Sequence, residues 1–137
     1  MSRVHACLAL MMGLTVALGP ASSRGQSSRG QAAVVVTIRL SNFAFDPHQV
    51  RLHSGVPVTL HLVNDSSGGH NFSAPAFFAA SAYPSGTPPL GGKVEVAARE
   101  SVDITVVPGA AGTYRVECTH FLHSLFGMTS SITVIGP

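Results

Sequence analysis

Charged side chains are scarce in this chain, and tryptophan is absent. Asp, Glu, Lys and Arg together make up 10% of the 137 residues, against 45% hydrophobic residues. A bundle of helices would need more charge to cover its outer surface, so the composition argues against that class. Glycine (14) and proline (9) are plentiful instead. A chain of this length and composition is typical of one compact all-β domain with many turns.

Basic residues form no run, and their excess disappears without the N-terminal leader described below. Cleavage after residue 24, within the range predicted below, would remove Arg3 and Arg24 and leave six bases against six acids, a net charge of zero. A nucleic-acid-binding domain ordinarily carries a basic patch or stripe. We therefore expect no nucleic-acid partner.

The first 23 residues have the three-part pattern of a secretory signal peptide. Arg3 supplies a positive charge, residues 6–18 form an almost unbroken apolar run, and small residues follow at positions 19–23. This pattern predicts cleavage near residues 21–25. The apolar run is short for a membrane span, although an uncleaved N-terminal anchor is the alternative. We expect a periplasmic or secreted protein with no stable membrane insertion after cleavage.

A polar segment separates this leader from the rest of the chain. Residues 22–31 (SSRGQSSRGQ) are small, polar and repetitive, which indicates a disordered linker. We assign residues 1–23 to the signal peptide, residues 24–32 to the linker and residues 33–137 to a single folded domain.

Seven segments of that domain alternate apolar and polar residues with a period of two. Segments with one apolar face each, separated by Gly and Pro, predict a sandwich of two β-sheets. Residues 73–92 are the exception, because they are long for a connection in such a fold. Their centre at residues 77–80 is a candidate short helix, and their aromatic side chains suggest a cover over one open edge of the core. The apolar positions of the seven segments are Val34, Val36, Ile38 and Leu40; Val50 and Leu52; Val56, Val58, Leu60 and Leu62; Val94 and Val96; Val102, Ile104 and Val106; Tyr114, Val116 and Cys118; and Ile132 and Val134.

Only one cysteine, Cys118, remains once Cys7 is removed with the leader. Exported proteins normally pair their cysteines, because the compartment oxidises them. A lone thiol in such a protein is a protected core residue, one half of an intermolecular disulfide, a nucleophile or a metal ligand. Cys118 has the parity of Tyr114 and Val116, so its sulfur is expected to point into the core.

Residues 117–128 (ECTHFLHSLFGM) contain the donors that favour a metal site. Met128 shares the inward parity of the last predicted strand, so His123 is expected between two inward-facing sulfur groups. His70, in the middle of the chain, offers a second imidazole. Two imidazoles, a thiolate and a weak thioether suit copper, and a His2Cys plane with a distant Met is the geometry of electron-transfer copper sites. Zinc bound to Cys118 and two histidines is the alternative metal.

The spacing Cys118-x4-His123-x4-Met128, with His70-Asn71 upstream, resembles the cupredoxins, the type 1 blue-copper proteins related to plastocyanin and azurin. The resemblance extends over residues 33–136. It implies a Greek-key β-sandwich of seven or eight strands and one copper ion in a type 1 site. It also implies that His70, Cys118 and His123 are the strong ligands and Met128 the axial one. Asn71 and Thr119 occupy the positions that brace the two ligand loops, with the Asn71 amide donating to the Cys118 sulfur.

His120 is an additional imidazole in this segment. Strand-like alternation from Cys118 would place it on the side of the thiolate, where it could replace His123 or join the site. The other interpretation is a histidine of the loop that does not bind the metal. Sequence alone leaves the two open.

Apolar side chains crowd the same segment. Some of them are expected to seal the metal from water, and those left exposed would form a patch around His123 that suits brief docking of a redox partner. Simple packing under residues 73–92 is the alternative. The side chains are Phe121, Leu122, Leu125 and Phe126.

These observations favour a monomeric one-electron carrier that cycles between Cu(I) and Cu(II). A periplasmic copper chaperone or scavenger, and an accessory module with the same fold and no redox cycle, are the alternatives. An enzyme is not expected, because four protein ligands leave no open coordination position for a substrate.

Overall fold

The computed structural model describes residues 33–137. The predicted signal peptide and linker, residues 1–23 and 24–32, lie outside the described residues. Within residues 33–137, no helix has both the length and the apolar character needed to cross a membrane.

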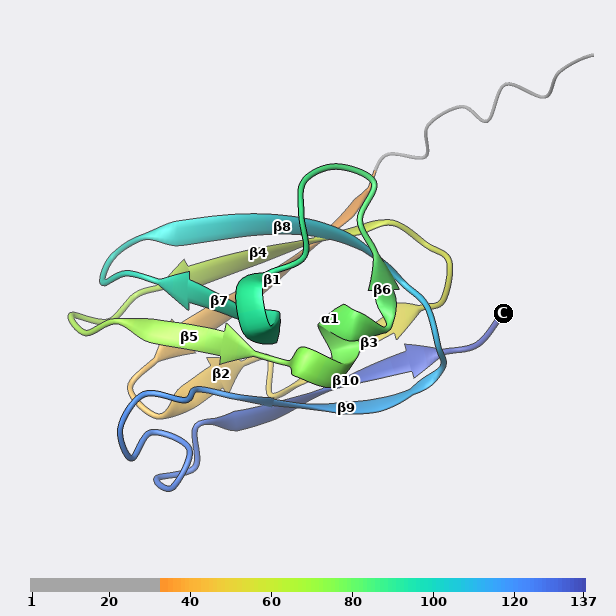
Figure 1. The fold of residues 1–137 in the computed structure, drawn as a ribbon. Coiled ribbons are helices and arrows are strands. Elements are labelled where there is room, and N and C mark those ends of the chain that lie inside the picture. Colours follow the sequence, from red (N-terminus) through yellow and green to blue (C-terminus); the bar gives the residue numbers. More distant parts are fainter. Residues whose placement is uncertain (1–32) are drawn as a thin grey trace, which may run out of the picture.

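Ten strands form two five-stranded sheets with the hydrophobic core between them (Figure 1). In chain order the strands are β1 (Val34–Ser41), β2 (Ala44–Asp46), β3 (Gln49–His53), β4 (Val58–Asn64), β5 (His70–Ser73), β6 (Ser81–Ala82), β7 (Lys93–Val96), β8 (Ser101–Pro108), β9 (Gly112–Glu117) and β10 (Thr129–Ile135).

The strand order shows that the chain crosses repeatedly between the sheets. One sheet has the order β2-β1-β4-β8-β6, and the other has the order β3-β10-β9-β5-β7. Neighbours are antiparallel except for β1 with β4 and β3 with β10. The predicted all-β sandwich with non-sequential, Greek-key connections is confirmed.

Alternation in the sequence explains which side chains enter the core. In β4, Val58, Leu60 and Leu62 are buried and the residues between them are only partly buried. Full burial of one such side chain contributes about 1.5–3 kcal/mol, so the inward face of each strand is strongly selected. The same rule places Val116 and Cys118, both completely buried, on one inward row.

The structure has more strands than the seven or eight expected. The additional ones, β2, β5 and β6, have only three, four and two residues. Two of them are too short to show a period. All four residues of β5 are buried, because both of its faces are covered, so its sequence does not alternate.

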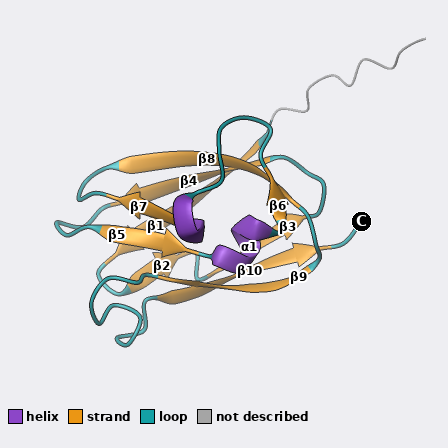
Figure 2. Ribbon diagram, in the orientation of Figure 1, coloured by secondary structure: helices purple, strands orange, loops and turns teal. Residues whose placement is uncertain are grey.

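The long connection after β5 forms the expected cover. It contains the short helix α1 (Pro75–Ala79) and the 3-10 turn η1 (Leu90–Gly92), which lie side by side beside the strands (Figure 2). The helix begins at a proline, whose missing N–H and restricted φ suit a first helical turn. Phe77 and Phe78 are buried, and their rings pack against Tyr114 and Phe72.

Candidate metal centre

The loops that carry the predicted ligands lie at one end of the sandwich. Figure 1 shows the β4–β5 turn and the β9–β10 loop at the end opposite the C-terminus. The second of these, residues 118–128, is called the ligand loop below. Residues 48 positions apart, His70 and Cys118, thereby become neighbours.

His70 begins β5 at the end of a tightly held turn. Nδ2 of Asn64 donates to the carbonyls of Gly68 and Val96 at 2.8 and 3.0 Å, and its Oδ1 accepts from the amide of Ser66 at 3.0 Å. An asparagine that bonds to the backbone two residues ahead mimics a turn of the main chain. The turn therefore delivers His70, which is only 2% exposed, in a fixed position opposite Val96.

Backbone hydrogen bonds shape the ligand loop, which contains no proline. The amide of Cys118 donates to the carbonyl of Met128 at 3.1 Å, and the amide of Met128 donates to the carbonyl of His123 at 2.9 Å. Further turns join His123 to His120 and Phe126 to Leu122. These bonds tie the three loop residues predicted as ligands to one another through the main chain.

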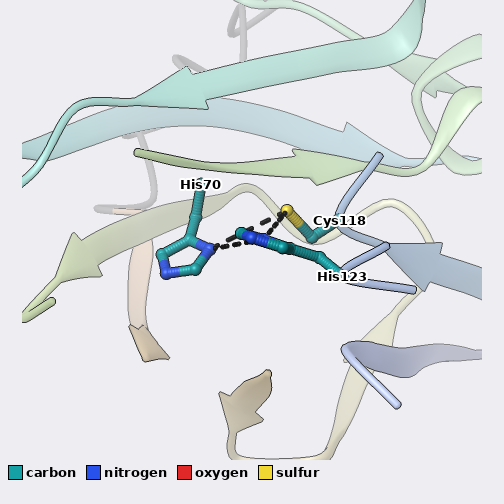
Figure 3. Close-up of side chains that lie close together, drawn as sticks. All are labelled: His70, Cys118 and His123. Carbon is teal, nitrogen blue, oxygen red and sulfur yellow. Dashed lines mark hydrogen bonds between the residues drawn. The ribbon is translucent and has the colours of Figure 1, made fainter. Parts of the chain in front are cut away.

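Three of the predicted ligand atoms converge on one point (Figure 3). Nδ1 of His70 lies 3.1 Å from Nδ1 of His123, and Sγ of Cys118 lies 3.9 and 3.4 Å from the same two nitrogens. In a triangle with these sides, the point equidistant from the three atoms lies about 2.0 Å from each, close to the length of imidazole–metal bonds. The donor set therefore has the size to hold one metal ion.

The protonation of His70 also suits a cation. Burial lowers the pKa of His70, and the neighbouring His123 and His120 lower it further. A neutral imidazole keeps a lone pair for a metal. The two Nδ1 atoms satisfy each other only if one carries a proton, whereas a metal ion satisfies both together with the sulfur. Nε2 of His70 is buried without a hydrogen-bond partner among residues 33–137, so this ring is held by packing and by its Nδ1 side.

Cys118 is a completely buried free thiol. The backbone amide of Asn71 donates to its Sγ at 3.5 Å, the contact that the resemblance implied. Such a bond fixes the orientation of the sulfur as a ligand.

Asn71 and Thr119 connect the two loops. Oδ1 of Asn71 accepts from the amide of Thr119 at 2.9 Å, and its Nδ2 donates to the Thr119 hydroxyl at 3.0 Å. The Asn71 side chain is buried, so these bonds are shielded from water. The brace sets the distance between His70 on one loop and Cys118 on the other.

Met128 is completely buried, with the inward parity expected from β10. Its main chain contacts Cys118 and His123, as described above. Coordination by its thioether stays a prediction.

His120 does not join the three converging ligands. Its Nε2 lies 3.0 Å from Oε2 of Glu95. The alternation expected beyond Cys118 is wrong, because β9 ends at Glu117 and the chain turns there. Of the two interpretations of His120, the structure favours the loop histidine.

Glu95 is a site residue that the sequence analysis missed. Burial raises its pKa, but hydrogen bonds from His120, Lys93 and Asn71 outweigh that effect and lower the pKa to about 2. Glu95 therefore carries a negative charge at neutral pH. Its alternation with Val94 and Val96 predicted only an outward side chain, because no local signal showed which loop would cover it.

Phe43 is the second residue that the sequence analysis missed. It lies in the β1–β2 turn with a positive φ of 61°, which is unusual for a bulky residue. Its ring packs edge-on against His123 at 5.3 Å and against Phe126 at 5.4 Å between centroids. An aromatic residue in a turn between two strands was the only signal available.

The apolar side chains of the ligand loop face outward. Phe121 and Leu125 are 86% and 75% exposed, and Leu122 and Phe126 are exposed as well. Sealing of the metal from water by some of them stays a prediction. Phe43, which packs edge-on against His123 and Phe126, adds a further apolar side chain beside that imidazole.

A two-sheet sandwich with two imidazoles and a buried thiol converging at one end defines a single-metal centre of the type 1 copper class. A protein-family model described as "Cupredoxin-like domain" matches residues 7–134, and the chain belongs to that family. Among curated proteins, none matches this sequence. The family and the donor set together identify the cofactor as one copper ion.

Solved structures share the fold. The Na-dithionite reduced auracyanin of the photosynthetic bacterium Roseiflexus castenholzii is 21% identical with a TM-score of 0.58, and the match covers 77% of this chain and 99% of that one. Auracyanin B is 26% identical with a TM-score of 0.57, over 75% of this chain and 89% of that one.

Proposed function

We propose that this chain is an exported one-electron carrier. The observation that carries the proposal is the convergence of His70, Cys118 and His123 on one point in a buried framework. Copper bound there supplies the Cu(I)/Cu(II) couple. The structurally similar auracyanin was crystallised in a dithionite-reduced form. A redox role for the present chain agrees with that observation.

The surrounding residues would restrain the ligand geometry in both oxidation states. The Asn71–Thr119 brace and the hydrogen bond to Cys118 connect the donors to the buried framework. A framework that moves little on electron transfer has a low reorganisation barrier. Met128, buried beneath the loop, is the proposed axial ligand.

His123 is the proposed exit for the electron. It is the less buried of the two ligand imidazoles, Phe43 packs against it, and the exposed apolar residues of the ligand loop flank it in sequence. A small apolar patch of this kind suits brief docking of a redox partner, because it excludes water without a large permanent interface. We propose a monomer that docks a partner protein through this patch and binds no nucleic acid. The patch consists of Phe43, Phe121, Leu122, Leu125 and Phe126.

The proposed compartment is the periplasm or the exterior of the cell. The N-terminal pattern of residues 1–23 supports export. Non-enzymatic function is proposed for a chemical reason: with Met128 as the fourth ligand, no coordination position remains for a substrate.

Absorption spectroscopy of the copper-loaded protein tests the proposal. The oxidised protein should show an intense visible thiolate-to-copper band, and Cys118→Ser should abolish it completely, because the thiolate is the electron donor of that transition. Voltammetry should show a reversible one-electron wave. Tight Cu(I) binding without such a wave would instead support a copper chaperone, and failure to bind either oxidation state would support an accessory module.

A further inference from the structure

A third imidazole lies beside the proposed ligands without being one of them. The ring centroid of His120 is 5.6 Å from that of His123 and 6.5 Å from that of His70. The two ligand rings are themselves 4.9 Å apart. Distance alone therefore does not keep His120 away from the metal.

The orientation of the His120 ring is what keeps it away from the metal. Nε2 of His120 lies 3.0 Å from Oε2 of Glu95, so that nitrogen is occupied by a carboxylate. About a third of the His120 side chain is accessible to solvent. Without a partner for that nitrogen, the ring would be free to turn about its side-chain bonds.

Glu95 is itself fixed by two other residues. Its Oε1 accepts from Nζ of Lys93 at 2.9 Å and from Nδ2 of Asn71 at 3.1 Å. Glu95 is also the register partner of Asn71 in the β5–β7 pair, so the two side chains share one face of the sheet. The carboxylate thus has a fixed position from which it holds His120.

We propose that Glu95 is a positioning residue that keeps His120 out of the copper coordination sphere. This inference rests on the proposed function. The physical reason is that an added imidazole nitrogen favours tetragonal Cu(II), whereas two imidazoles and one thiolate in a plane give the blue electron-transfer geometry. Glu95 preserves the second geometry in a loop that carries one histidine too many.

A cycle of variants tests the proposal by absorption and paramagnetic resonance of the Cu(II) protein. Glu95→Ala should weaken the visible thiolate band, strengthen a band at higher energy and shift the resonance toward a tetragonal signal. His120→Gln should leave the wild-type spectrum unchanged. In Glu95→Ala combined with His120→Gln the wild-type spectrum should return, because no third imidazole is left to bind. A spectral change that survives in the double variant would show that Glu95 acts through Asn71, and would overturn the proposal.

Two further variants control for the loss of charge and for the loss of side-chain shape. Glu117→Ala removes the same charge one residue before Cys118, where Glu117 pairs with Arg115, and it should leave the spectrum unchanged. If Glu117→Ala changes the spectrum in the same way as Glu95→Ala, the effect is one of charge and the proposal fails. Glu95→Gln keeps the side-chain shape with only one oxygen, and it should give a weaker change of the same kind as Glu95→Ala.

Nuclear magnetic resonance provides a direct measurement with Cu(I), which is diamagnetic. On addition of Cu(I) to nitrogen-15-labelled protein, ring nitrogens of His70 and His123 should shift and those of His120 should not. In Glu95→Ala those of His120 should shift too. A wild-type shift of His120, or an unchanged His120 in the variant, would overturn this inference alone. Wild-type protein that takes up no copper would overturn the proposed function together with it.

Discussion

The two segments that supply the ligands have opposite surroundings. In β5 all four residues are buried, and each of them is paired in register with a residue of β7. The ligand loop, in contrast, is held by its own backbone turns and exposes most of its apolar side chains. The difference suggests a division of work: β5 sets the geometry of the site, and the ligand loop gives access to it.

The largest effect on stability is expected from a change in β5, the buried segment. Asn71→Ala removes the acceptor for the Thr119 amide and the donor to Glu95. Loss of these bonds at a buried position should lower the free energy of unfolding by about 2 kcal/mol. Denaturant unfolding of the metal-free protein measures this loss without a contribution from copper affinity.

Asn42→Ala is the matched control, because Asn42 is exposed in the neighbouring β1–β2 turn. Its unfolding free energy should stay within about 0.5 kcal/mol of the wild type. Equal losses in the two variants would contradict the assignment of Asn71 as the brace between the loops.

The next effect concerns Met128, at the boundary between the loop and β10. Met128→Leu keeps the buried volume, so the metal-free protein should lose less than about 1.5 kcal/mol of unfolding free energy. The copper-loaded protein should nevertheless show a shifted visible band and a changed reduction potential, because the thioether is gone. An unchanged spectrum and potential would show that Met128 only fills the core.

What the sequence predicted well depends on local periodicity. The burial of Cys118 and Met128 followed from alternation, because each directly adjoins a strand. His120 was beyond that rule, since β9 ends before it. Glu95 and Phe43 could not be predicted, because their contacts depend on which strands and turns, distant in sequence, meet at the same end of the sandwich.

A smaller effect on the free energy of unfolding is expected at acid pH, where Glu95 on the outer face of β7 takes up a proton. Unfolded Glu95 takes up a proton near its ordinary pKa of 4.5, whereas the folded protein does so only near about 2. Between these values the unfolded state binds more protons, so the stabilisation from Glu95 is complete above pH 4.5 and is lost as the pH falls toward 2. Glu95→Gln lacks this loss.

Acid unfolding of the metal-free wild type and of metal-free Glu95→Gln measures this difference in stability. The wild type should lose more stability than Glu95→Gln on going from pH 5 to pH 2, by less than about 1 kcal/mol because water screens a half-exposed carboxylate. Parallel curves for the two proteins would mean that the bonds to His120, Lys93 and Asn71 do not hold Glu95 ionised.

Changes to the exposed side chains of the ligand loop should have the smallest effect on stability. Their effect on electron transfer should be large. Leu125→Ser changes a side chain that is 75% exposed, so the unfolding free energy should stay within about 0.5 kcal/mol. Electron self-exchange between oxidised and reduced copies requires two exit faces to meet. Losing a leucine from such a contact costs about 1.5 kcal/mol, which slows exchange by up to roughly tenfold.

Line broadening in mixtures of the Cu(I) and Cu(II) protein measures that rate. Leu90→Ser is the matched control, because Leu90 is 94% exposed in η1, outside the ligand loop. Slower exchange in Leu125→Ser with an unchanged rate in Leu90→Ser places the exit at the ligand loop. If the two variants slow exchange equally, exposure alone explains the effect, and the ligand loop loses its special role in access.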